Sequence, residues 1–363
     1  MKKQKKLVAV MLCMVMLVSA LAGCGTGSTS APVSSGPAAS SESDSPSAPA
    51  DTTEPEYIFK FSHHAPAVGV QNTGIDYFCS LVEEYSGGRI KMENYPAGQL
   101  AEKVATLEGL VVGTIELSEM ASTDFTMYDD LWDVFAMPYL FDNGMQTVRV
   151  ENDPRIRAMT DASAADMGFV ILSWLNYSER NIINTLKPIE TPDDMKGLKI
   201  RVMQSAALVD AMTALGAASI TMPWTECYSA VQQGVLDAVE NSTPVLTSNA
   251  FHEVCPYYSL TKHFIVSDQV FISKKVYDSL PADLQEVLIR AGKDYETHWN
   301  DVLWPAAEEE EMQMLIDYGT QINEPDLAPF MERAQTANEK TVSKFNERQK
   351  ELYDLIMEVK KDY

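Results

Sequence analysis

The sequence predicts an α/β fold with largely parallel sheets, because strand patterns alternate with helix patterns along the chain. Short apolar runs typical of strands lie at residues 57–62, 114–117, 168–174, 198–203, 218–222 and 235–239. Helix patterns lie at residues 99–113, 205–215 and 281–316. The last of these is the longest, and Trp299 and Trp304 provide it with large side chains for packing.

Capping residues mark several helix ends. Thr191 is expected to be the N-cap of a short helix that has Pro192 at its first position and ends at Gly197. Thr225 is expected to be the N-cap of another helix, which ends at Gly234.

The amino end predicts secretion. Residues 1–23 place four lysines before an apolar run that is too short to span a bilayer, which is the pattern of a removed signal peptide. The run ends in Leu-Ala-Gly-Cys24, which resembles the lipobox of bacterial lipoproteins, so Cys24 is expected to be lipidated. An ordinary signal with an incidental cysteine is the alternative. Residues 24–55 are rich in Ser, Ala and Pro and are expected to form a flexible tether.

The charge limits the classes of partner. The formal net charge is −24, and the signal contributes only lysines, so the mature chain is more acidic still. This charge argues against nucleic acid and anionic lipid as partners, but not against an acidic ligand in a closed pocket. Cys79, Cys227 and Cys255 have no metal or redox spacing and are expected to be small buried residues, with one disulfide possible.

Polar and aromatic residues follow the predicted strands at their carboxyl ends, where open α/β sheets bind ligands. They are His63, His64, residues 176–180, Arg201, Trp224, Glu240 and Asn241. Alternation within residues 198–203 directs Arg201 away from the apolar face of its strand. A guanidinium group matches a carboxylate with two parallel hydrogen bonds, while Trp224 could stack on an organic acid and Asn241 could bond to it.

Each of these residues also has an ordinary structural interpretation. Arg201 could form a structural ion pair, and Trp224 could belong to a core. His63 and His64 are by default exposed or capping residues, and because neighbours in a strand point to opposite faces they do not predict a metal site. Glu240 is by default a solvated acid or an ion-pair partner. The sequence has neither Gly-x-Ser-x-Gly nor His-Glu-x-x-His, which argues against the corresponding enzymes.

Several separately spaced motifs together resemble a known family. Residues 180–189 read Arg-Asn-Ile-Ile-Asn-Thr-Leu-Lys-Pro-Ile, and residues 195–203 read Met-Lys-Gly-Leu-Lys-Ile-Arg-Val-Met. Further matching motifs lie at residues 95–100, 135–139, 215–217, 222–228, 232–237 and 240–241. They resemble the DctP-type solute-binding subunits of tripartite ATP-independent periplasmic (TRAP) transporters, from about residue 57 to the carboxyl-terminal helix.

The resemblance implies a two-lobed, periplasmic-binding-protein-like fold with a ligand cleft between the lobes and a long helix that spans both. Lobe I is then expected to comprise residues 56–179 and about 266–306. Lobe II is expected to comprise residues 180–265 and about 307–363, including the carboxyl-terminal helices.

The resemblance also implies roles for single residues. Arg201 matches the arginine that forms the main salt bridge to the ligand carboxylate, and Arg180 resembles a second arginine that often joins it. Asn241 matches the asparagine of a Glu-Asn-Pro motif, although Ser242 replaces the proline here.

Trp224 matches an aromatic residue that commonly lines the pocket, and His64 lies where the other lobe often supplies a polar contact. The implied function is capture of a small organic acid outside the cytoplasm and delivery to the small and large membrane subunits of an ion-gradient-driven permease. No enzyme activity, cofactor or metal is implied. A ligand-presenting accessory of a signalling receptor is the alternative, followed by an extracytoplasmic enzyme, and the sequence leaves the identity of the acid open.

Overall fold

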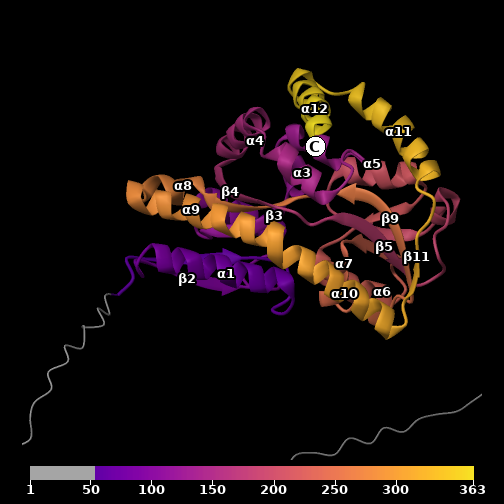
Figure 1. Cartoon of the computed structure of the whole chain (residues 1–363), viewed down its shortest axis with the longest axis horizontal. Helices are drawn as coiled ribbons and strands as arrows, with labels where there is room; N and C mark the ends of the chain where they lie inside the picture. Colours follow the sequence, from indigo (N-terminus) through magenta and orange to yellow (C-terminus); the bar gives the residue numbers. More distant parts are fainter. Residues whose placement is uncertain (1–53) are drawn as a thin grey trace, which may run out of the picture. The chain divides into compact units, whose positions relative to one another are not determined.

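The computed structural model describes residues 54–363, which contain two β-sheets (Figure 1). The strands of the first sheet are β1 (Tyr57–Ser62), β2 (Ile90–Tyr95), β3 (Leu117–Ala121), β4 (Phe169–Leu175) and β10 (Asp268–Ser273), in the order β2-β1-β3-β10-β4. The strands of the second sheet are β5 (Glu179–Asn184), β6 (Lys199–Val202), β7 (Ala218–Thr221), β8 (Ala238–Asn241), β9 (Tyr257–Ile265) and β11 (Gln321–Asn323), in the order β11-β9-β5-β8-β6-β7.

Both sheets are mixed, with five parallel and four antiparallel strand pairs in the described chain, so the prediction of largely parallel sheets is only partly correct. β1 runs parallel to β2 and β3, and β6 runs parallel to β7 and β8. In contrast, β10 is antiparallel to β3 and β4, and β5 is antiparallel to β8 and β9. The chain passes between the two sheets through the short connections β4–β5 and β9–β10. Neither connection contains a helix, whereas parallel neighbours in one sheet need a long crossover that is usually helical.

Helices cover both sheets. Around the first sheet lie α1 (Val70–Tyr85), α2 (Lys103–Val112), α3 (Gly144–Glu151), α4 (Pro154–Met167), α8 (Lys274–Ser279), α9 (Ala282–His298) and α12 (Glu347–Val359). Around the second lie α5 (Ala206–Leu215), α6 (Trp224–Gln232), α7 (Thr243–Ser248), α10 (Trp304–Tyr318) and α11 (Ala328–Val342). Short 3-10 helices are η1 (Ser122–Met127), η2 (Asp130–Ala136), η3 (Pro192–Met195), η4 (Phe251–Glu253) and η6 (Lys360–Asp362).

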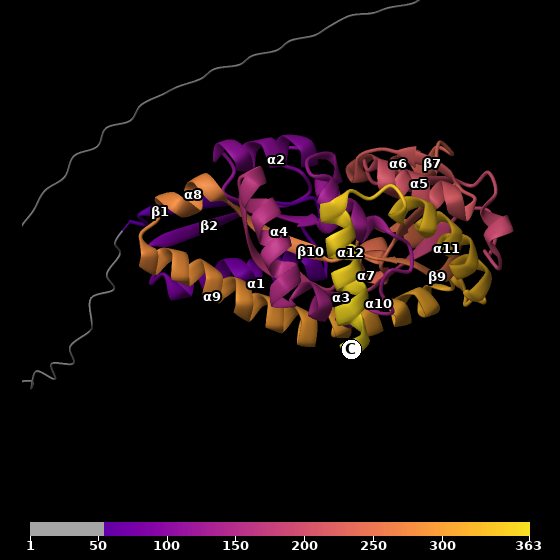
Figure 2. The same cartoon turned by 90° about the horizontal axis from the view of Figure 1, so that it is seen from above.

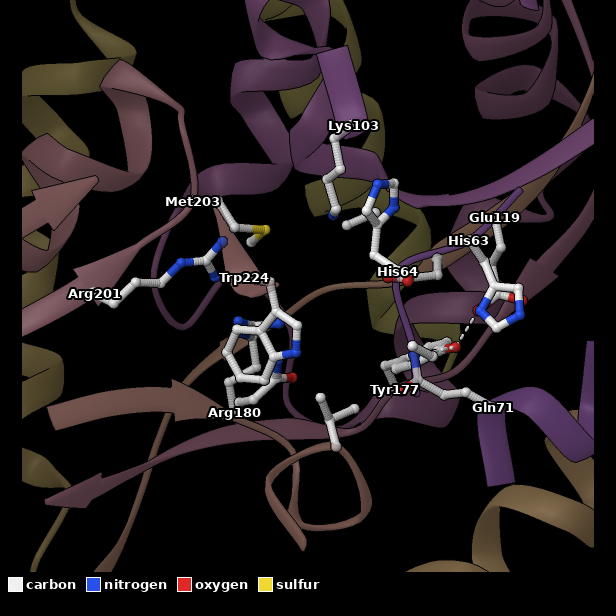
Figure 3. A pocket seen from close by; sticks show the side chains of 15 residues that line it. His63, His64, Gln71, Lys103, Glu119, Tyr177, Arg180, Arg201, Met203 and Trp224 are labelled. Atoms are coloured by element: carbon white, nitrogen blue, oxygen red, sulfur yellow. Dashed lines mark hydrogen bonds between the residues drawn. The ribbon is translucent and has the colours of Figure 1, made fainter. Parts of the chain in front are cut away.

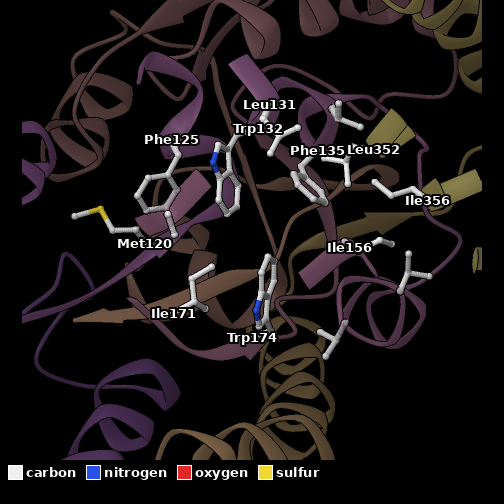
Figure 4. Close-up of a cluster of buried hydrophobic side chains, with 14 of the residues drawn as sticks. Met120, Phe125, Leu131, Trp132, Phe135, Ile156, Ile171, Trp174, Leu352 and Ile356 are labelled. Atoms are coloured by element: carbon white, nitrogen blue, oxygen red, sulfur yellow. The ribbon is translucent and has the colours of Figure 1, made fainter. Parts of the chain in front are cut away.

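Each sheet has two of the four hydrophobic clusters, which explains why its strands are apolar on both faces. In the first sheet, one cluster joins Trp132 and Trp174, which stack at 6.2 Å, to Leu352 and Ile356 of α12 (Figure 4). The other cluster contains side chains of α1 and α9. The second sheet packs against α5 and α11 through one cluster and against α6, α7 and α10 through the other.

A continuous helical segment runs along both halves (Figure 2). It consists of α9, the π-helical turn η5 (Trp299–Leu303) and α10. α9 packs on α1 and β4 of the first half, whereas α10 packs on α7 of the second. Gly292 allows the close approach, because a Cβ there would overlap the carbonyl oxygen of Leu172 on β4. The long helix expected at residues 281–316 is therefore confirmed, with a π turn in the middle.

Some predicted boundaries shift. The strand expected at 114–117 is β3, which begins only at Leu117. The helix expected after Thr225 begins at Trp224 and has Pro223 as its N-cap, because the fixed backbone angle of proline suits the turn into a helix. The strand expected at 235–239 is β8, which ends at Asn241.

The predicted lobe boundaries remain a proposal. Each predicted lobe contains the strands of one sheet, but α12, which was placed in lobe II, packs on η2 and α4 of the first half. The predicted signal peptide at 1–23, the predicted lipidation site Cys24 and nearly all of the predicted tether at 24–55 lie outside the described residues. Within residues 54–363, no helix is both long and apolar enough to cross a membrane.

Candidate functional site

A cavity of about 70 Å³ lies where the carboxyl ends of β1, β3, β6 and β8 meet (Figure 3). A cavity of this size has room for roughly five water molecules. The structure brings all five predicted ligand-binding residues into its lining: His64, Arg180, Arg201, Trp224 and Asn241. They come from both halves of the fold, which is the arrangement expected of a cleft between lobes.

Arg201 is a buried cation without a carboxylate partner in the described part of the chain. It is 4% exposed, and its Nε donates to the carbonyl oxygen of Met222 at 3.1 Å. No carboxylate within residues 54–363 lies at ion-pair distance from it, and its Nη1 and Nη2 make no hydrogen bond there. Burial lowers the pKa of Arg201, which shows how poorly its charge is solvated. An anion in the cavity would supply the missing counter-charge.

Trp224 holds the guanidinium from one side. The Cζ of Arg201 lies 5.2 Å from the centroid of the Trp224 ring, within the range of a cation–π interaction. The indole Nε1 donates to Asn249 Oδ1 at 3.1 Å, and the ring packs on Phe251 at 5.2 Å. These contacts fix the ring at the start of α6, so it is neither a plain core residue nor a mobile surface group.

Arg180 forms a bidentate ion pair with Glu240. Its Nε and Nη2 donate to Oε2 and Oε1 at 2.6 and 2.8 Å, and Nη2 also bonds to the backbone oxygen of Glu240 at 3.0 Å. Burial alone raises the pKa of Glu240, but the charge and hydrogen bonds of Arg180 outweigh it and lower this pKa to about 2. Only Nη1 of Arg180 makes no hydrogen bond in the described chain. The two predicted arginines are thus not equivalent.

The side-chain amide of Asn241 lines the cavity, and its oxygen accepts a backbone hydrogen bond. Its Oδ1 accepts from the backbone N–H of Ser242 at 2.9 Å, whereas Nδ2 has no partner among the described residues. The proline expected at this position by family likeness would lack that N–H, so Ser242 supports the orientation of Asn241 in this chain.

His63 and His64 are buried, so the expectation that they are exposed or capping residues is wrong. They are 2% and 9% exposed. His64 Nε2 lies 3.1 Å from the carbonyl oxygen of Ala101, and its Nδ1 has no hydrogen-bond partner among the residues that the structure describes. Burial, together with the charge of Lys103, lowers the pKa of His64 to about 4, and burial lowers that of His63 equally far. Both rings are therefore neutral at pH 7.

Other residues that line the cavity were not predicted from the sequence. They include Gln71, Lys103, Glu119 and Asp268. Tyr177, which also lines the cavity, lies in the predicted segment 176–180. An acid inside the strand sequence Leu-Ser-Glu-Met-Ala at 117–121 could have pointed to Glu119 as a site residue. The predicted strand ended at Leu117, so Glu119 fell outside it. Asp268 opens β10, a strand that was not predicted.

A second cavity, of about 200 Å³, is also lined by side chains of both halves and shares His64, Arg201 and Trp224 with the first. Beside it, Thr225 Oγ1 donates to Glu102 Oε1 at 2.9 Å and joins the two halves. Because this bond is exposed, it can break when the halves separate.

Comparison with known proteins identifies the family. Residues 61–345 match the family described as bacterial extracellular solute-binding protein, family 7 (DctP). The chain belongs to this family. The C4-dicarboxylate-binding periplasmic protein DctP of Rhodobacter capsulatus is 30% identical over 72% of this chain and 78% of its own. Family membership confirms that this protein is a TRAP-type solute-binding subunit, whose role is in transport and not in presenting ligand to a receptor.

Solved structures of DctP relatives confirm the two-lobed α/β fold. A TRAP periplasmic solute-binding protein from a Sulfitobacter species, with bound β-D-galacturonate, has a TM-score of 0.78 and 28% identity and covers 82% of this chain and 99% of its own. A TRAP periplasmic solute-binding protein from Anaerococcus prevotii, with bound D-glucuronate, has a TM-score of 0.80 and 27% identity. The match covers 85% of this chain and 99% of the other.

Two other groups of residues were candidates for chemistry. No set of three or more His, Cys, Asp or Glu side chains within residues 54–363 is arranged to hold a metal ion. Cys79, Cys227 and Cys255 are free and buried, and burial raises the pKa of each thiol. Thiols in this state are poor nucleophiles.

Proposed function

We propose that this protein captures a small organic acid by binding its carboxylate to Arg201 and releases it unchanged to the small and large membrane subunits of an ion-gradient-driven TRAP permease. The observation that carries the proposal is the buried guanidinium of Arg201, which faces a cavity and has no carboxylate partner in the described chain. Its planar donors match a carboxylate bidentately.

The comparisons support an acid as the ligand. The Rhodobacter relative is named for C4-dicarboxylates, and the Sulfitobacter and Anaerococcus structures contain galacturonate and glucuronate. These molecules differ in skeleton and in the number of hydroxyl groups. Because they share a carboxylate, that group is what a common arginine would recognise.

We assign supporting roles to the other predicted residues. Trp224 covers an apolar face of the ligand, and Asn241 donates from Nδ2. Arg180 contributes through Nη1 while its other donors hold Glu240. His64, a neutral imidazole with Nδ1 unpartnered, supplies a contact from the first half of the fold.

We also propose that the mature protein begins at lipidated Cys24 and is anchored to the cell membrane outside the cytoplasm, at the outer face or in the periplasm. The support is the order of charged, apolar and small residues before Cys24. The tether to residue 55 would let the folded part reach the permease.

A screen of organic acids by thermal shift tests the proposed function. A ligand at 100 times its dissociation constant adds about 2.7 kcal/mol to the free energy of unfolding, which raises the midpoint temperature measurably. We expect at least one carboxylic acid to stabilise the protein, whereas its amide should not. Long incubation with that acid should return it unchanged. Turnover beyond one equivalent of acid per protein would identify an enzyme instead.

A further inference from the structure

The side of the cavity opposite Arg201 carries acids. Figure 3 shows Arg201, Met203 and Trp224 on one side and Glu119 and Tyr177 on the other. Glu119 lies on β3, opposite Val270 of the antiparallel strand β10, and Asp268 lies two residues before Val270. Glu119 and Asp268 are therefore diagonal neighbours on one face of the sheet, close enough for their charges to interact.

Neither acid is neutralised by a cation of the described chain. Tyr177 and Tyr295 donate hydrogen bonds to Glu119, but no Lys, Arg or His of residues 54–363 lies at ion-pair distance from it. The Asp268 carboxyl has no hydrogen bond there either, although it lines the cavity. Burial first, and the charge of Asp268 second, raise the pKa of Glu119, while burial raises the pKa of Asp268. The pair therefore holds a proton more readily than ordinary carboxyls do.

Two of the three Lys and Arg side chains that line the cavity are paired with carboxylates, which leaves one positive charge for a ligand. Arg180 is paired with Glu240, and Lys103 Nζ lies 2.5 Å from Asp124 Oδ2. Arg201 alone has no carboxylate partner within the described residues. One guanidinium group balances one ligand carboxylate. A second carboxylate, placed across the cavity, would meet the two acids and no free cation.

Neutral polar groups beside the acids also lack partners. His63 is buried and lines the cavity, yet neither of its ring nitrogens has a hydrogen-bond partner within residues 54–363. The neighbouring Gln71 donates to the Tyr177 hydroxyl at 3.1 Å, but its buried Oε1 is unpartnered. Each unpartnered buried donor or acceptor is costly, and a ligand that both donates and accepts would satisfy it.

We propose that the cavity takes monocarboxylic acids that carry several hydroxyl groups, with the carboxylate at Arg201 and hydroxyl groups at Glu119 and Asp268, and that it rejects dicarboxylates. A hydroxyl group can donate to the charged member of the acid pair and accept from the protonated one. His63 binds a further hydroxyl as a neutral imidazole. This inference rests on the proposed function, because it requires a ligand carboxylate at Arg201.

Titration calorimetry with two matched panels tests the inference. The first panel is D-glucuronate, D-galacturonate, D-gluconate and D-galactonate, and the second is succinate, L-malate and fumarate. We expect the best hydroxylated monocarboxylate to bind at least 100-fold more tightly than the best dicarboxylate. In Asp268→Asn, which removes a charge that attracts hydroxyl donors and repels carboxylates, this ratio should fall at least 10-fold. Asp283→Asn, at a surface ion pair with Arg89, is the control and should leave the ratio unchanged.

The possible failures are distinguishable. A dicarboxylate that binds the wild-type protein as tightly as the best hydroxylated acid overturns the inference, even if Asp268→Asn does not fold. An unchanged ratio in a folded Asp268→Asn protein also overturns it. In both cases Arg201 can still be the carboxylate site. If no acid of either panel or of the wider screen binds, the proposed function falls with the inference.

Discussion

Glu240 occupies the guanidinium fork of Arg180 in a buried, bidentate ion pair with N–O distances of 2.6 and 2.8 Å. This pair decides which arginine is available to an anion. If Glu240 were absent, the cavity would present two unpaired guanidinium groups and could balance two ligand carboxylates. With Glu240 in place, we expect Arg201 to be the main anion receptor and Arg180 mainly to shape the wall beside it.

Glu240→Gln should destabilise the protein by about 3 kcal/mol or more, because it leaves Arg180 as an uncompensated buried charge. Urea unfolding at pH 7 measures the change. Glu56→Gln breaks the exposed pair of Glu56 with Arg89 and should reduce the free energy of unfolding far less, because surface ion pairs contribute little to stability. Equal small losses in the two variants would show that the buried pair has no special role.

Trp224→Phe should weaken binding of the acid found in the screen by roughly 0.5–2 kcal/mol, which is about 2-fold to 30-fold in affinity. The smaller ring reduces the cation–π interaction with Arg201, and it loses the hydrogen bond to Asn249. Calorimetry measures the affinity. Tyr228→Phe, on the same helix but outside the cavity lining, is the control and should bind normally.

Stability should depend on pH in two opposite ways. The pKa of Glu119 is raised above its ordinary value of 4.5 by burial and by Asp268, so the folded state binds this proton more tightly. The free energy of unfolding should therefore decrease as pH rises from about 4.5 toward 8. The pKa of Glu240 is lowered to about 2, so its contribution should be lost as pH falls from about 4.5 toward 2.

Chemical unfolding at a series of pH values checks both slopes. Glu119→Gln should reduce the loss of unfolding free energy at higher pH and leave the loss at low pH unchanged. Glu240→Gln should reduce the loss at low pH and leave the loss at higher pH unchanged. A decrease at higher pH that is as steep in Glu119→Gln as in the wild type would contradict this assignment of the proton.

Cys24→Ser should release the protein from membranes or leave its signal uncut. Membrane fractionation and mass spectrometry of the mature amino terminus measure the two outcomes. Normal membrane retention of the variant, with no lipid on the wild-type protein, would remove the lipoprotein proposal.

The sequence predicted the elements whose signals are local. The N-cap Thr191, the helix after Ser205 and the apolar strand with Arg201 near its end all depend on neighbouring residues, and the structure confirms them. The directions of the strands could not be predicted from neighbouring residues. Whether β10 pairs antiparallel with β3 depends on where the chain crosses between the sheets, and no short sequence pattern indicates such a crossing.

The cavity was predicted best where residues belong to a motif. Arg201, Trp224 and Asn241 follow recognisable strands and turns and are found together. Glu119 and Asp268 were missed because each is an ordinary acid in its own segment, and they become a pair only when β3 and β10 are neighbours. Glu240 was named as a solvated acid or an ion-pair partner, but its pairing with Arg180 was not predicted, because the two residues are 60 positions apart in sequence.

The most direct test of the account is the affinity of Arg201→Lys for the acid found in the screen, measured by calorimetry on protein whose folding is verified by its unfolding transition. Lysine keeps the charge but loses the planar fork. We predict a loss of about 2–5 kcal/mol, or at least roughly 30-fold in affinity, while Arg333→Lys, at an exposed pair with Asp193, binds normally. Affinity of Arg201→Lys within about threefold of the wild type would contradict the account and make Arg201 a structural residue.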